Sequence, residues 1–527
     1  MFPSWRVSPR LQNLLSPKIW RGLILTLLIC LFWGIPANPL LADETPTRPK
    51  TSIQPYLDRV MDQVSEFRLD NGMKFIVLER HKAPVVSFLI YADVGGVNEP
   101  QNQTGVAHYL EHLAFKGTKR IGTTNYPQEK PLLEQMDRLF EQIQAAEKQG
   151  KSEEVAQLVS KFETVQAEAS KFVKQNEFSK IVERAGGVGL NAATSTDSTV
   201  YFYSLPANKL ELWMSLESER FLEPVFREFF KEKQVILEER RLRTENSPVG
   251  QMIEQFTATA FQVHPYRRPV IGYLEDIENL NRDNVDQFFK TYYVPNNLTV
   301  AIVGDVNPAQ VKQLAQTYFG RYQAGAEPPK LQVVEPPQKQ TREISMKLKS
   351  QPWYFEGYHR PSLAHPDHVI YEVIASILSN GRTSRLYQTL VEQQQIALAA
   401  EGFSGYPGDK YPNLMLFYAL TAPGHSVEEA AVALRKEIER LKTEPVSLEE
   451  LERVKTQARA SLLRSLDSNM GMAFALLEYE VKTKTWMNLF KQLDAITQIT
   501  PADIQRVAQE TFRPENRTIG RLLPEDS

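Results

Sequence analysis

Two histidines and a glutamate stand at a spacing that could bind a metal ion and activate water. The segment His108-Tyr109-Leu110-Glu111-His112 places the histidines four residues apart. On a helix such side chains leave the same face one turn apart, so both imidazoles can bind one Zn²⁺. Glu111 would reach the edge of the same site, where its carboxylate can take a proton from a water on the ion. The pattern predicts a hydrolytic zinc centre.

A third ligand must come from elsewhere, because a catalytic zinc ion usually takes three protein ligands and leaves the fourth position to water. The single cysteine, Cys30, lies in an N-terminal apolar run. If that run is removed, only histidine, aspartate or glutamate can complete the site. The remaining histidines have no ligand spacing except His365 and His368, which we interpret as structural or solvated; the set is His81, His264, His359, His365, His368 and His425.

The N-terminus has the order of a secretory signal peptide. Basic residues such as Arg6 and Lys18 precede the apolar run 22–35, and a small-residue region ends at Ala42. We therefore predict a signal peptide over 1–42 and a Pro- and Thr-rich arm over 43–60. The alternative is an uncleaved anchor, but the run is shorter than the roughly 20 residues that span a bilayer. The expected protein is exported, periplasmic or secreted, with no membrane segment after cleavage.

Composition favours a globular protein of more than one domain. The chain has 527 residues, of which 42% are hydrophobic and 24% charged, with a net charge of −3. A phosphate binder usually carries a strong basic excess, so the charge argues against nucleic acid as a partner. The length predicts two or three domains.

The periodicity of the sequence predicts two α+β halves. Pro328, Pro329, Pro336 and Pro337 mark a linker over 323–342, between a domain at 61–322 and another at 343–527. A hairpin is expected over 67–79, turning at Asp70-Asn71-Gly72, and Gly186–Ser195 is expected to be a loop. Other predicted strands are 85–93, 199–204, 298–305, 352–358 and 414–420. Predicted helices are 104–117, 206–245, 248–262, 282–291, 367–379, 383–394, 427–442 and 447–465.

Residues 128–178 differ in character from their surroundings. A helix is expected to begin near Pro131, to break at Gly150, and to be followed by a charged helix from Ser152 to Lys174. We interpret the pair as a helical hairpin inserted into the first domain. It is either a solvated insertion, which we favour, or an arm that binds a partner.

The residues around the histidines resemble a known family. Residues 105–118 are similar to the zinc helix of the pitrilysin or insulin-degrading enzyme family, the inverzincins, in the branch of bacterial and mitochondrial-processing peptidases. The resemblance extends from about residue 62 to 520. Further matching segments are 187–195, 232–239, 264–272, 293–305 and 381–387.

The resemblance implies roles for three more residues. Glu239 would be the third zinc ligand, and Glu232, two helical turns earlier, would join the catalytic group as a carboxylate that orients the site. From the residues alone, Glu238 is as good a ligand candidate as Glu239. Asn191 resembles the family residue on an edge strand near the zinc, which would hold the substrate backbone or the attacked carbonyl, although an Asn in a Gly-rich turn is also ordinary. The long separation of His112 from Glu239 is accounted for by the inserted hairpin.

The resemblance fails at two positions of the second half. Family members that act alone have an Arg and a Tyr there, which grip the substrate and stabilise the intermediate. This chain has Val391 and Leu398 instead. Either a related partner chain supplies the pair in a heterodimer, which we favour because the zinc residues are complete, or the activity is lost. A homodimer is the other assembly considered.

The resemblance implies two homologous domains, each a mainly antiparallel sheet packed with helices, which together form half of a clamshell. The expected function is that of a zinc endopeptidase subunit that hydrolyses peptides or short unfolded polypeptides outside the cytoplasm. The alternative is a non-proteolytic, zinc-containing assembly or scaffold subunit.

Overall fold

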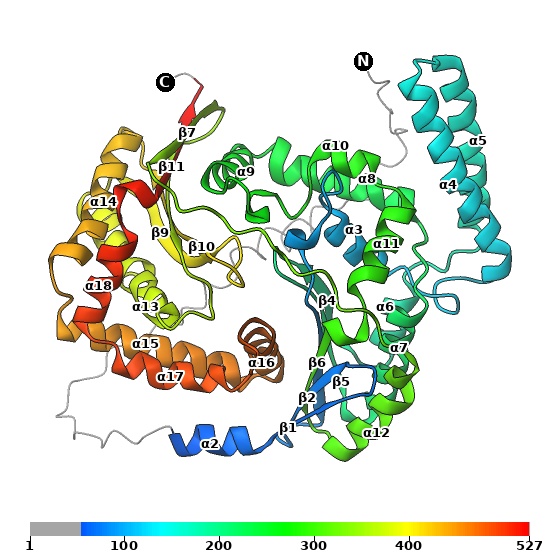
Figure 1. Ribbon diagram of the computed structural model, residues 1–527, viewed down its shortest axis with the longest axis horizontal. Helices are drawn as coiled ribbons and strands as arrows, with labels where there is room; N and C mark the ends of the chain where they lie inside the picture. Colours follow the sequence, from blue (N-terminus) through cyan, green and yellow to red (C-terminus); the bar gives the residue numbers. More distant parts are fainter. Residues whose placement is uncertain (1–53, 526–527) are drawn as a thin grey trace. The chain divides into compact units, whose positions relative to one another are not determined.

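The computed structural model describes residues 54–525 (Figure 1). The predicted signal peptide lies outside these residues, as does most of the predicted arm. The end of that arm is helical, α2 (Gln54–Asp62), because Leu57 and Val60 share one face and are both buried. Among the described residues, no helix is long and apolar enough to cross a membrane.

A six-stranded sheet lies at the centre of the first half of the chain. Its strands run in the order β1-β2-β6-β3-β5-β4, and only the β2–β6 pair is parallel. The predicted hairpin at Asp70-Asn71-Gly72 joins β1 and β2. The strands are β1 (Val64–Arg68), β2 (Lys74–Glu79), β3 (Val85–Ala92), β4 (Val188–Thr194), β5 (Thr199–Pro206) and β6 (Leu298–Gly304).

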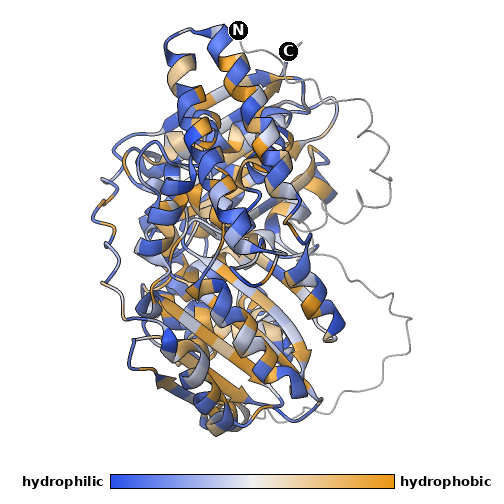
Figure 2. Cartoon of the chain, turned by 90° about the vertical axis from the view of Figure 1, so that its right-hand side faces the viewer, coloured by the Kyte–Doolittle hydropathy of each residue, from blue (hydrophilic) through white to orange (hydrophobic). Residues whose placement is uncertain are grey.

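Helices cover both faces of this sheet. Phe88 of β3 stacks on Trp213 of α7 (Leu210–Leu222), with ring centroids 4.6 Å apart. On the opposite face, Phe202 of β5 meets Phe474 of α16 (Asn469–Thr483) at 5.0 Å. The alternation of side chains along a strand produces these two buried faces. The strands are accordingly mostly hydrophobic, whereas the helices mix both kinds of residue (Figure 2).

The second half is built on a five-stranded sheet of order β7-β11-β8-β10-β9, in which only β7–β11 is parallel. Its strands are β7 (Arg342–Leu348), β8 (Trp353–Arg360), β9 (Ala397–Tyr406), β10 (Asn413–Thr421) and β11 (Arg517–Pro524). It packs with α13 (His368–Ser379), α14 (Val427–Thr443), α15 (Leu448–Asp467), α17 (Asn488–Gln498) and α18 (Pro501–Thr511). The predicted fold class, α+β with two mainly antiparallel sheets and helices, is confirmed.

Each half contributes a helix to the sheet of the other half. α16 packs on β3 and β6 of the first sheet, and α9 (Pro248–Ala260) packs on β7 and β11 of the second. Phe256 of α9 lies 6.2 Å from Phe355 of β8, measured between ring centroids. The two sheets are therefore joined by exchanged helices as well as by the chain.

The hairpin predicted near 128–178 is present as α4 (Tyr126–Lys148) and α5 (Ser152–Ser170), followed by α6 (Glu177–Arg184). The two long helices lie side by side in Figure 1 and pack on each other. The ring centroids of Phe140 of α4 and Phe162 of α5 each lie 4.9 Å from that of Phe230 of α8 (Phe229–Arg240).

The expectation of a loop over Gly186–Ser195 was wrong, because the segment forms β4 along most of its length. β4 is an edge strand, largely exposed, so it lacks the alternation of apolar residues that identifies a half-buried strand. Its pairing with β5 is also irregular between Val188 and Asn191. The predicted helix at 383–394 is a π-helical segment, Tyr387–Gln393.

Candidate metal centre

Both histidines lie on α3 (Val106–Leu113), a short and mostly buried helix of the first half. It begins after Gly105, whose φ of +87° favours glycine. A Cβ on Gly105 would lie 2.6 Å from the carbonyl oxygen of Ile271, so glycine also allows the close approach of that segment. Val106, Ala107, Tyr109, Leu110 and Leu113 are buried, and this fixes the face on which the histidines stand.

The side chains of His108, His112 and Glu239 converge. Nε2 of His108 lies 3.8 Å from Oε1 of Glu239, and Nε2 of His112 lies 3.6 Å from Oε2. The two imidazole centroids are 4.8 Å apart. One donor atom from each of the three side chains lies within 4.8 Å of the others.

This donor set fits a zinc ion. The separations exceed the roughly 2.7–3.2 Å of a hydrogen bond. They approach the edge of about 3.3–3.6 Å expected for a tetrahedron with bonds of about 2.0–2.2 Å. Burial, with the nearby charges of His112 and Arg243, lowers the pKa of His108 to about 3. The ring is therefore neutral, which is the form that binds metals.

Glu238 and Glu239 point in different directions. The Glu239 side chain is 20% exposed and faces the histidines, with Arg243 bonded to its Oε1 at 2.9 Å. The Glu238 side chain is 54% exposed and pairs with Arg241. Consecutive helical residues are separated by about 100° around the axis, so only one of the two can face the site. The structure brings Glu239, and not Glu238, to the histidines.

Glu232 lies behind His112. Its Oε2 is 3.4 Å from Nδ1 of His112, and its Oε1 is 2.5 Å from Nζ of Lys116. Burial raises the pKa of Glu232, but its hydrogen bonds to His112 and Lys116 outweigh this and lower the pKa overall. An anion on Nδ1 orients the imidazole and leaves Nε2 directed at Glu239.

Glu111 lies at the edge of the donor set. The Thr194 hydroxyl, at the end of β4, donates a hydrogen bond of 2.8 Å to Oε2 of Glu111. Burial raises the pKa of Glu111, although the bond from Thr194 and the charge of His112 oppose the rise. A raised pKa suits a group that must accept and later return a proton.

Two contacts fix α3 against α8. The Tyr109 hydroxyl donates to the carbonyl of Phe229, and the two rings lie 4.7 Å apart. Arg227, just before α8, is fully buried and donates to the carbonyls of Lys116, Thr118 and Ile121 in the segment after α3. Arg227 also pairs with the buried Glu129 of α4, at 3.0 Å. The hairpin is thus bonded to the segments that carry the metal donors.

Asn191 lies on β4, at the exposed edge of the sheet that borders α3. Its side-chain oxygen accepts a hydrogen bond of 2.9 Å from the backbone of Ala192, and the residue is exposed. In the second half, Val391 packs against the core, whereas Leu398 on the edge strand β9 is 51% exposed. Neither side chain can donate a hydrogen bond.

Sequence reasoning missed several neighbours of the site. Thr194, Lys116, Arg243 and Arg227 were not singled out; Thr194, Lys116 and Arg227 act through contacts between segments distant in the chain. A sequence signal existed for Lys116, which stands one helical turn after His112, and for Arg243, which stands one turn after Glu239.

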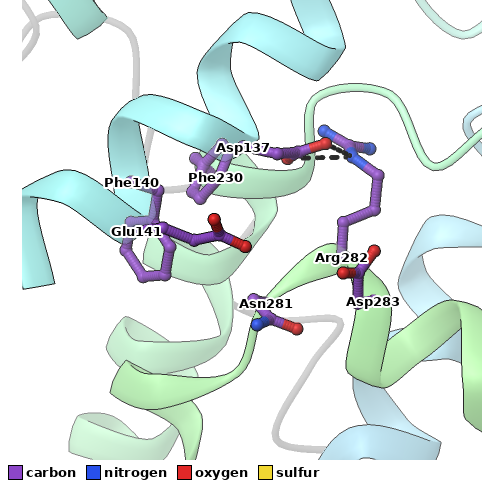
Figure 3. A pocket seen from close by; sticks show the side chains of 7 residues that line it. All are labelled: Asp137, Phe140, Glu141, Phe230, Asn281, Arg282 and Asp283. Atoms are coloured by element: carbon purple, nitrogen blue, oxygen red, sulfur yellow. Dashed lines mark hydrogen bonds and ion pairs between the residues drawn. The ribbon is translucent and has the colours of Figure 1, made fainter.

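The pocket in Figure 3 is separate from the metal donors. It lies between α4 and the start of α11 (Arg282–Tyr292) and has a volume of about 10 Å³, the room of about one water molecule. Asp137 pairs with Arg282 beside it at 2.9 Å. The remaining lining residues are Phe140, Glu141, Phe230, Asn281 and Asp283. It lies where these helices meet, and His108, His112 and Glu239 are not among the residues that line it.

Two family models match most of the chain. The family described as Insulinase (Peptidase family M16) matches residues 74–143 and 162–273, and the Peptidase M16 inactive domain matches 279–458. The gap at 144–161 falls at the far end of the α4–α5 hairpin.

Individual relatives span most of the chain. The zinc protease PqqE of Helicobacter pylori is 29% identical over 467 residues, covering 86% of this chain and 92% of the relative. A probable mitochondrial-processing peptidase subunit beta of Schizosaccharomyces pombe is 26% identical over 464 residues, covering 84% and 87%. The crystal structure of a protease from Helicobacter pylori has a TM-score of 0.74 at 28% identity, covering 88% of this chain and 99% of that one.

Proposed function

Since the chain belongs to peptidase family M16, the insulinase family, we propose that it is a zinc-dependent endopeptidase subunit that hydrolyses peptides or short unfolded polypeptides. The observation that carries the proposal is the convergence of His108, His112 and Glu239 within 4.8 Å, with Glu111 next to His112 on α3. Relatives named as zinc proteases support it.

His108, His112 and Glu239 would hold the zinc ion. When bound, the ion supplies a Lewis acid that polarises a carbonyl and acidifies water. Glu111 accepts the proton of the attacking water at Oε1, while its Oε2 is held by Thr194. It then returns the proton to the departing amine. Glu232 keeps the His112 ring in orientation through Nδ1.

The substrate would bind as an added strand on β4. β4 pairs with β5 on one side, and an edge strand offers unpaired backbone groups to a second chain. Asn191 is exposed on this edge and would hold the peptide backbone with its amide. Backbone pairing favours extended, unfolded segments and demands little of the substrate sequence.

A second family chain would complete the site. Val391 and Leu398 cannot provide the hydrogen bonds expected of the second half, while every zinc residue is in place. A heterodimer with a chain that carries an Arg and a Tyr would combine both parts, and a relative named as a peptidase subunit supports this assembly. A homodimer would leave the pair missing.

The proposed location is outside the cytoplasm. The support is the basic and apolar N-terminal sequence, which has the order of a cleaved signal peptide.

Glu111→Gln tests the function, with Glu238→Gln as the matched control. We expect Glu111→Gln to keep stoichiometric zinc and to lose turnover of a quenched fluorescent peptide by about 10²–10⁴-fold, the typical contribution of a general base. Glu238→Gln should change neither. A scaffold subunit would show no chelator-sensitive hydrolysis in the native assembly, and its biological role would survive Glu111→Gln.

A further inference from the structure

The turn between β4 and β5 is held by a loop of the second sheet. Asp197 in this turn is 2% exposed. Its carboxylate accepts hydrogen bonds from the backbone N–H groups of Asp409 at 2.9 Å and Lys410 at 3.1 Å. It also accepts one from the Tyr266 hydroxyl at 2.7 Å. Asp409 and Lys410 belong to residues 407–412, here called the β9–β10 loop.

The contact between this loop and the turn leaves no spare room. A Cβ on Gly408 would lie 2.4 Å from Oδ2 of Asp197 and 2.4 Å from Oγ1 of Thr196. On its other side the loop is tied to α16, where Lys482 donates to Asp409 at 2.6 Å. Close-packed groups transmit a displacement instead of absorbing it. A shift of the loop must therefore move the turn.

The same turn leads to Glu111. Thr194, at the end of β4, precedes Asp197 by three residues and donates to Glu111 at 2.8 Å. Internal bonds make the turn stiff: the N–H of Ser195 donates to the carbonyl of Ser198 at 2.8 Å, and the N–H of Asp197 donates to Oγ of Ser195 at 3.1 Å. Asp197 and the Thr194 hydroxyl are thus parts of one rigid unit.

We propose that Asp197 is a positioning residue through which the β9–β10 loop sets the hydrogen bond from Thr194 to Glu111. The inference rests on the proposed function, because it assigns Glu111 the work of a general base. The second half then contributes to the chemistry through the first sheet, without contacting the reacting atoms. Tyr266 belongs to the same unit, because its hydroxyl donates to the Asp197 carboxylate and accepts a hydrogen bond of 3.2 Å from the backbone N–H of Tyr411 in the loop.

The experiment uses the zinc-loaded, full-length protein in its native assembly, with a quenched fluorescent peptide of mixed sequence as probe. We expect Thr194→Val to lower kcat about 10- to 100-fold, the usual cost of losing such a supporting bond, and Thr194→Ser to recover most of the loss. Gly408→Ala should lower kcat by about tenfold with zinc affinity within about twofold of wild type.

Gly96→Ala is the matched control for the glycine substitution. Gly96 bonds to Ser195 on the same turn, but an added Cβ would meet nothing nearer than 3.7 Å. Its kcat should stay at the wild-type value. When Gly408→Ala is added to Thr194→Val, kcat should fall by less than about threefold further, because the effects of substitutions at coupled residues are not additive. Should Gly408→Ala not fold, Tyr266→Phe takes its place.

Three results would overturn the proposal: full kcat in Thr194→Val, an additive loss in the double variant, or a fall of zinc affinity that parallels the fall of kcat. Hydrogen exchange provides a readout independent of activity. Gly408→Ala should accelerate exchange of the amides of 194–198 and leave those of 106–113 unchanged. If the wild-type protein hydrolyses no peptide, the proposed function fails by itself, and unchanged exchange at 194–198 would still refute the positioning.

Discussion

Replacing Glu129 by glutamine would test how the helical hairpin stabilises the metal helices. Arg227 uses its donors on five hydrogen bonds, two to the Glu129 carboxylate at 3.0 and 3.2 Å and three to the carbonyls that follow α3. The Glu129 and Arg227 side chains are 0% and 1% exposed. Breaking a buried pair by removing one partner costs about 3–5 kcal/mol. Since the amide oxygen of glutamine keeps one of the two bonds, we expect Glu129→Gln to lower the free energy of unfolding by about 3 kcal/mol.

The assay is urea unfolding of the full-length protein, followed by tryptophan fluorescence. Glu134→Gln is the control, because Glu134 lies on the same helix α4 with its side chain 49% exposed and paired with Lys130. An exposed pair of this kind contributes at most about 1 kcal/mol. If the two variants lost the same free energy of unfolding, the claim that the hairpin anchors this region would be refuted.

Three further outcomes are expected. Burial raises the pKa of Glu99 to about 8, above its unfolded value, so the folded state binds the proton more tightly and the free energy of unfolding must fall as pH rises from about 4.5 to 8. Glu99→Gln should remove this slope and gain up to about 5 kcal/mol of unfolding free energy relative to wild type at pH 9 in urea titrations; parallel curves would contradict it. Lys116→Met should weaken zinc binding about 10- to 100-fold in chelator competition, because Glu232 loses its cation; an unchanged affinity would exclude that role. Glu239→Gln should abolish stoichiometric zinc in elemental analysis, whereas Glu238→Gln should retain it.

Much of the fold could be predicted because local signals agreed with tertiary structure. The hairpin at Asp70-Asn71-Gly72, the apolar strand at 298–304 and the long helices of the second half all carry their own periodicity. The spacing of His108 and His112 needed only the assumption of a helix. Glu239 could be separated from Glu238 by family resemblance, and the direction of each side chain then agrees with it.

The rest depended on contacts that a sequence does not display. Periodicity alone did not indicate β4, because an edge strand need not alternate apolar and polar residues; only the family resemblance placed Asn191 on an edge strand. Thr194 reaches Glu111 only because β4 ends beside α3, and Asp197 meets its partners only because the β9–β10 loop folds back on the first sheet. Small polar residues in turns are common, so none of these could be distinguished by type alone.

Anomalous diffraction at the zinc absorption edge, on crystals of the full-length protein grown with zinc, would test most directly whether three side chains share one ion. We predict a single peak within about 2.0–2.2 Å of Nε2 of His108, Nε2 of His112 and one carboxylate oxygen of Glu239. A zinc peak at another place, or no peak in crystals grown with excess zinc, would contradict the assignment of this site and the peptidase chemistry built on it.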